Sequence, residues 1–95
     1  MEIKHLPIGT VVQLKGSDKR VMITGYLCTE ASHPDTVWDY SAVKFPLGFV
    51  DAKEMLCFNN ASIETICVLG YVDLEQMEFI DKIDAIADEI RNQGA

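Results

Sequence analysis

The chain has 95 residues, a formal net charge of −7 and a pI of about 4.6. This length predicts a single domain, residues 1–95, and a hydrophobic content of 48% is enough for a folded core. Fifteen acidic residues against eight Lys and Arg disfavour contact with phosphate backbones and anionic lipids. We therefore expect neither nucleic acid nor a membrane as a partner.

The N-terminal part, residues 1–72, predicts an antiparallel β-sheet. Residues 10–15 and 20–27 are rich in β-branched side chains and flank four turn-forming residues, so we expect a hairpin. Gly25 inside its second strand predicts a bulge or a sharp bend.

The rest of the sheet portion begins with residues 28–36, which are polar and predict a loop. Further strands are expected at residues 37–45, 55–58 and 62–69. The last of these is apolar on both faces, which is typical of a strand that is central or covered on both sides.

The C-terminal part, residues 73–93, predicts an amphipathic helix. Asp73 is its expected N-cap, Gln76 completes a capping-box spacing, and Val72 and Met77 are spaced as a hydrophobic staple. Seven acidic and two basic residues lie between positions 73 and 91, so the acidity of the chain is concentrated here. One face is apolar: Met77, Phe79, Ile80, Ile83, Ile86, Ala87 and Ile90.

Strands followed by a single helix indicate the α+β class. We expect a small, curled antiparallel sheet of about four or five strands and one C-terminal amphipathic helix. Short strands and the bend at Gly25 leave closure into an SH3-like barrel open.

The sequence offers little catalytic chemistry. His5 and His33 lie far apart and outside any metal-binding spacing, and no phosphate-binding glycine loop occurs, so we expect neither a metal nor a cofactor. Cys28, His33 and Asp35 could act as nucleophile, base and orienting group. A polar loop is a poor platform for such a triad, so we expect no enzyme, and a small thiol enzyme remains the rival hypothesis.

The remaining cysteines and Asp39 have simpler interpretations. Cys57 and Cys67 lie in apolar strands and are expected to fill the core. Three cysteines without a C-x-x-C pair predict reduced thiols in a cytoplasmic protein. Asp39, between Trp38 and Tyr40, is expected to point outward from an alternating strand, and a binding groove between the two rings is the alternative.

Several segments resemble one known family, DUF4176, a domain of unknown function. They are the opening Leu6–Gly16 (LPIGTVVQLKG), Val21–Gly25, Asp39-Tyr40, Phe45–Phe49, Phe58-Asn59, and Gly70-Tyr71 before an acidic helix. Phe45 stands where the family commonly has Tyr, and the segment around His33 is longer than the family pattern suggests. The resemblance implies a protein of Gram-positive bacteria, encoded beside type VII secretion genes and their LXG-type toxins, and it brings no catalytic residues.

The resulting hypothesis is a cytoplasmic, non-catalytic protein-interaction module. The resemblance implies an accessory, chaperone or targeting factor of a type VII secretion toxin cluster. Its partner would be a secreted effector, a secretion component or a second copy of the chain. The alternative is an immunity protein that neutralises a cognate toxin domain, which suits an acidic chain facing a basic partner.

The expected binding surface is the C-terminal part of the apolar stripe: Ile83, Ile86, Ala87 and Ile90. A helix over residues 74–92 is about 28 Å long, whereas strands of five or six residues span about 17–20 Å. The helix should therefore overhang the sheet and contact another chain through these residues. The alternative is that the helix bends back and the same residues complete the core.

Overall fold

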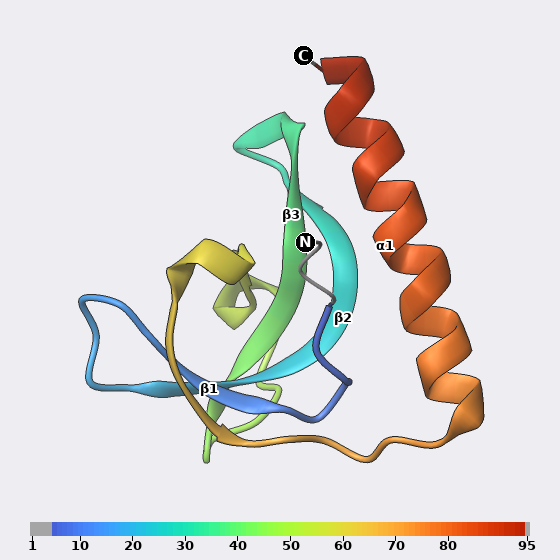
Figure 1. The fold of residues 1–95 in the computed structure, drawn as a ribbon. Helices are drawn as coiled ribbons and strands as arrows, with labels where there is room; N and C mark the ends of the chain where they lie inside the picture. Colours follow the sequence, from blue (N-terminus) through green and yellow to red (C-terminus); the bar gives the residue numbers. More distant parts are fainter. Residues whose placement is uncertain (1–4, 95) are drawn as a thin grey trace.

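The computed structural model describes residues 5–94, with side chains described as far as Arg91. It contains a five-stranded antiparallel sheet followed by one long helix, so the predicted α+β class is confirmed (Figure 1). The strands are β1 (Val11–Leu14), β2 (Arg20–Glu30), β3 (His33–Phe45), β4 (Leu56–Phe58) and β5 (Ile63–Val68), and the helix is α1 (Leu74–Gly94). Two short 3₁₀ turns, Ala52–Glu54 and Asn60–Ser62, flank β4.

The sheet is curled but open. Its strand order is β4-β3-β2-β1-β5, so β4 and β5 are the two edge strands. Each pairs with one neighbour in the part of the chain that the structure describes, β4 with β3 and β5 with β1. The SH3-like barrel that the sequence left open is therefore not formed.

The polar segment 28–36 is not a loop, contrary to the prediction. β2 and β3 continue through it as a long hairpin that closes at Ala31 and Ser32, where Glu30 pairs with His33. Near the tip, residues 33–36 of β3 and Thr29 of β2 are exposed, so polar side chains are compatible with strand structure there. Pro34 is tolerated because proline lacks only one backbone donor, a loss that an exposed strand end accommodates.

The predicted bulge at Gly25 is confirmed. The register of β2 against β3 shifts between Ile23 and Gly25, and a Cβ added at Gly25 would lie 2.8 Å from Ser41 Oγ. This distortion curls β2 and β3 around the core, visible as the arc of β2 in Figure 1. The core cluster comprises Val12, Val21, Ile23, Tyr40, Ala42 and Phe58.

The last strand differs most from its prediction. β5 is an edge strand, and all its residues after Ile63 are exposed, so the expectation of a central or doubly covered strand is wrong. An apolar pattern on both faces indicates that a strand suits burial, but the strand order of the sheet decides whether anything covers it.

The helix begins as predicted, with one difference. Asp73 Oδ1 accepts a hydrogen bond from the Gln76 backbone N–H at 2.8 Å, which confirms the N-cap. The Gln76 side chain donates to the Tyr26 hydroxyl at 3.2 Å instead of returning to the cap, so the capping box is incomplete. Val72 and Met77 are both about half exposed, so the predicted staple buries neither.

The helix runs beside β2 and buries one stripe against the rest of the chain (Figure 1). That stripe includes Ile80, Ile83 and Ala87. β2 and β3 have 11 and 13 residues, about twice the expected strand length. The mismatch in length that predicted an overhanging helix is therefore largely removed. Within residues 5–94, no helix is long and apolar enough to cross a bilayer.

Candidate functional site

The most polar feature of the interior is centred on Asp39 of β3. Asp39 is 4% exposed, so the outward orientation expected from strand alternation is wrong. Its carboxylate accepts a hydrogen bond from the Asn60 N–H at 2.8 Å, pairs with the Arg91 guanidinium and lies 3.5 Å from His5 Nε2. Burial alone would raise the pKa of Asp39, but His5, Arg91 and the Asn60 N–H together hold this pKa well below its usual range.

His5 joins this carboxylate to the helix. Asp84 Oδ1 of α1 accepts the His5 backbone N–H at 2.9 Å and lies 2.6 Å from His5 Nδ1. Burial lowers the pKa of His5, and the two carboxylates of Asp39 and Asp84 outweigh that effect and raise it. The His5 side chain is only 2% exposed. The cluster thus ties the N-terminal segment, β3 and α1 together by opposite charges, while His5 Nε2 is buried without a hydrogen-bond partner among the described residues.

Two tyrosine hydroxyls reinforce the same junction. Tyr26 donates to the Leu6 carbonyl at 2.5 Å, and Tyr40 donates to Asn60 Oδ1 at 2.6 Å. The Leu6 N–H in turn donates to the Tyr40 hydroxyl at 2.8 Å. Both phenols are therefore occupied by contacts within the chain.

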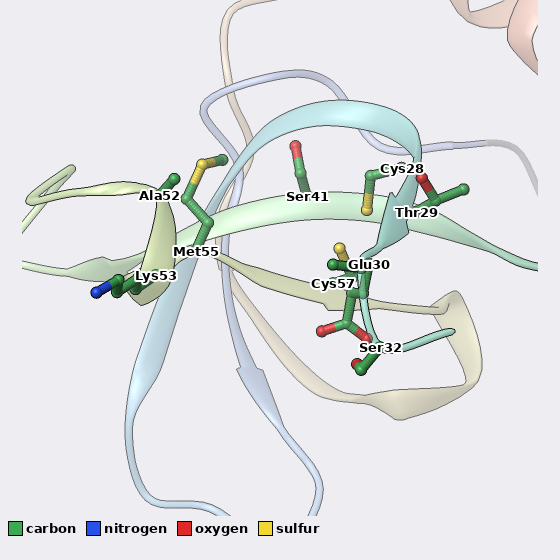
Figure 2. Close-up of a pocket in the computed structure, with 10 residues that line it drawn as sticks. Cys28, Thr29, Glu30, Ser32, Ser41, Ala52, Lys53, Met55 and Cys57 are labelled. Carbon is green, nitrogen blue, oxygen red and sulfur yellow. The ribbon is translucent and has the colours of Figure 1, made fainter. Parts of the chain in front are cut away.

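The candidate thiol nucleophile lies in a hollow of about 470 Å³ between β2 and β4. Figure 2 shows the sulfurs of Cys28 and Cys57 pointing toward each other across it. The Cys28 thiol donates to the Tyr40 carbonyl at 3.1 Å, and burial together with the neighbouring Cys57 raises its pKa to about 12. Cys28 is consequently a protonated thiol at neutral pH, and the thiolate is the form that attacks.

The structure does not bring the proposed base and orienting group to this thiol. His33 and Asp35 are exposed near the hairpin tip, and neither lines the hollow. His33 Nδ1 instead lies 3.1 Å from Ser32 Oγ. The arrangement does not fit the nucleophile, base and orienting group suggested by the sequence.

The other two cysteines differ in their surroundings. Cys57 is partly buried, whereas Cys67 is exposed, so the prediction that Cys67 fills the core is wrong. The reason is its place on the edge strand β5. In the described residues, no group of three or more His, Cys, Asp and Glu side chains could hold a metal ion.

The four residues predicted to bind a partner fall into two groups. Ile83 and Ala87 are 8% and 3% exposed, which favours the alternative that they complete the core. Ile86 is 45% exposed and Ile90 is partly exposed. Contact with another chain remains a prediction for Ile86 and Ile90.

A second apolar surface was missed by the sequence reasoning. It follows β5 and the segment that leads into α1, and we name it the edge surface: Ile66, Val68, Leu69, Tyr71 and Leu74. Tyr71 is 78% exposed and Leu74 is 71% exposed. In Figure 1 this stretch runs from β5 along the base of the sheet to the start of α1. Successive exposed apolar side chains of this kind are typical of protein-binding surfaces.

One sequence signal accompanies the edge surface. Residues 54–81 contain six acidic residues and no Lys, Arg or His. This run could have been found without a structure. It could not have been assigned to a binding surface, because the same pattern also describes an ordinary solvated face.

Comparison with known families identifies the chain. A family model described as a domain of unknown function, DUF4176, matches residues 5–79. The chain belongs to this family. The DUF4176 match includes the five strands, the edge surface and the start of α1, and it ends before Ile83. Neither the curated proteins nor the solved structures gave a match.

Proposed function

We propose that this DUF4176 protein is a non-catalytic protein-interaction module. The observation that carries the proposal is the edge surface, where five large apolar side chains within residues 66–74 are about half exposed or more. Leaving apolar area in water forgoes about 25 cal/mol per Å². In a 95-residue chain with a small core, that loss is substantial unless a partner covers the surface.

The charged groups around Asp39 and the Cys28 thiol support the same proposal because they interact within the fold. Asp39, His5 and Arg91 neutralise one another between the sheet and α1. The Cys28 thiol is protonated and hydrogen-bonded to a backbone carbonyl. These arrangements stabilise structure, and they favour a binding role over a thiol enzyme.

We further propose that the module works in the cytoplasm as an accessory to a type VII secretion toxin cluster, as a chaperone or targeting factor for the exported toxin. The resemblance of this chain to DUF4176, which implies a gene beside such clusters, motivates this setting. A chaperone of an exported protein needs an accessible apolar surface that holds its client before export, and the edge surface meets that need.

The test is a capture experiment with the full chain, tagged and expressed at native level. Wild type should recover a toxin or a secretion component encoded in the same cluster. Replacing Tyr71 and Leu74 by Ser should abolish recovery, whereas Leu47→Ser should retain it. Leu47 is a matched control because it is 65% exposed and lies outside the edge surface. Recovery of neither component by wild type would overturn the secretion setting.

A second candidate, an immunity protein, is favoured by the charge of −7, which suits a basic toxin domain. The two functions separate in cells. An immunity protein protects a host that expresses the toxin domain alone, whereas a chaperone binds the secretion-targeting region and changes the amount of toxin exported.

A further inference from the structure

The free edge of β5 suits the addition of another strand. β5 pairs with β1 on one side, and no strand pairs with its other side within residues 5–94. An edge strand presents backbone N–H and C=O groups that can bind an extended segment of another chain. β5 is therefore a template as well as an apolar surface.

The side chains of β5 do little to protect this edge. Soluble proteins commonly place Lys or Pro on exposed edge strands to prevent pairing, and β5 contains neither. Ile66 and Val68 are 47% and 56% exposed, and Leu69 follows directly. An added strand would bury these side chains together with those of its own.

The shape of β5 argues against a second copy of this chain as the occupant. The register of β1 against β5 shifts twice, between Val11 and Val12 and between Gln13 and Leu14. Bulges of this kind increase the twist and hinder flat pairing of two identical edges. Two copies would also each bring a net charge of −7.

The charge of the chain indicates the chemistry of the partner. The net charge is −7, and the one charged side chain in β5 is the exposed Glu64. Complementary charge selects partners and steers their approach. A matching segment therefore carries Lys or Arg beside its apolar residues.

We propose that β5 receives an extended partner segment that combines apolar residues with Lys or Arg, and that this segment becomes a sixth strand of the sheet. This inference rests on the proposed interaction function and specifies its mode. Val68 pairs with Val11 and Ile66 pairs with Val12, so these two exposed residues lie on opposite faces of the sheet, and the added strand meets an apolar side chain on each face.

The probe is a synthetic ten-residue peptide built from Val-Val-Lys-Lys repeats, which place both residue types on each face of a strand, titrated into the full-length protein. Matched peptides carry Glu in place of Lys, or keep the charge and carry two central Pro residues that block strand pairing. We expect slowed amide exchange in β5 on binding, and affinity at least about tenfold weaker for the Glu and Pro peptides. Val68→Lys in the protein should weaken binding by a similar factor, and Leu47→Lys should leave it unchanged.

Three results would overturn strand addition. The first is that the Pro peptide binds as tightly as the Val-Lys peptide. The second is that the bound peptide is helical. The third is that the free protein forms a dimer and that Val68→Lys abolishes this dimer. The capture experiment separates this failure from failure of the proposed function. If the toxin or secretion component is recovered equally by wild type and Val68→Lys, the protein is still an interaction module but β5 is not its template. If wild type recovers none, the proposed function itself fails.

Discussion

Asp39→Asn tests whether the buried charge cluster holds α1 against the sheet. The substitution keeps the shape of the side chain and removes its charge. The amide oxygen can still accept the Asn60 N–H, which lies 2.8 Å from the carboxylate in the wild type. It can no longer neutralise His5 at 3.5 Å or the paired Arg91.

The magnitude follows from the burial of the two partners. Removing one member of a buried ion pair costs about 3–5 kcal/mol. The Arg91 side chain is 50% exposed, so solvent screens its attraction to Asp39, and loss of this pair contributes about 1 kcal/mol or less to the destabilisation. His5 is buried and can lose its proton, which limits the cost. We therefore expect the free energy of unfolding to fall by about 3 kcal/mol, a decrease in Tm of roughly 12–24 °C for a domain of this size.

The assay is urea unfolding followed by circular dichroism at pH 7, with Asp35→Asn as the control. Asp35 is exposed near the hairpin tip, so its replacement should change stability by less than about 0.5 kcal/mol. Because folding lowers the pKa of Asp39, its contribution is complete above about pH 4 and is lost as the pH falls. The variant should therefore lose less stability in acid than wild type. Equal unfolding midpoints for Asp39→Asn and Asp35→Asn would refute the reasoning.

Three further predictions concern other parts of the fold. Folding raises the pKa of His5, so its stabilisation is complete below about pH 6.5 and is lost at higher pH. Urea titrations from pH 5 to pH 9 should show this loss in wild type and not in His5→Gln. A Cβ at Gly70 would lie 2.1 Å from a backbone oxygen, so Gly70→Ala should cost about 3 kcal/mol. Gly16→Ala is the control: Gly16 has a φ of +78° and open space around it, so the change should cost about 1 kcal/mol. Equal Tm shifts for Gly70→Ala and Gly16→Ala would contradict the close packing at Gly70. Ala87→Glu buries an unpaired charge and should lower the Tm by more than about 10 °C. Ile86 is exposed, so Ile86→Glu should leave the Tm nearly unchanged. A larger decrease in Tm for Ile86→Glu than for Ala87→Glu would contradict the orientation of α1.

The sequence by itself determined those features that depend on neighbouring residues. The β1–β2 hairpin, the bulge at Gly25 and the N-cap at Asp73 were all predicted and all observed. Each depends on turn chemistry, backbone freedom or capping within a few residues of the chain. The α+β class follows from the order of such segments, and the family follows from short motifs spread over most of the chain.

Tertiary structure alone decided which of these elements are covered. The apolar alternation of β5 is the same whether the strand lies in the centre of the sheet or at its edge, so the edge surface could not be predicted. The buried state of Asp39 depends on Arg91, 52 residues away, and on His5, because a charge in the interior requires nearby partners. The face of α1 that binds the sheet was identified by its period. Which of its apolar residues remain exposed was set by how α1 packs against the rest of the chain, and contacts between residues far apart in the sequence determine that packing.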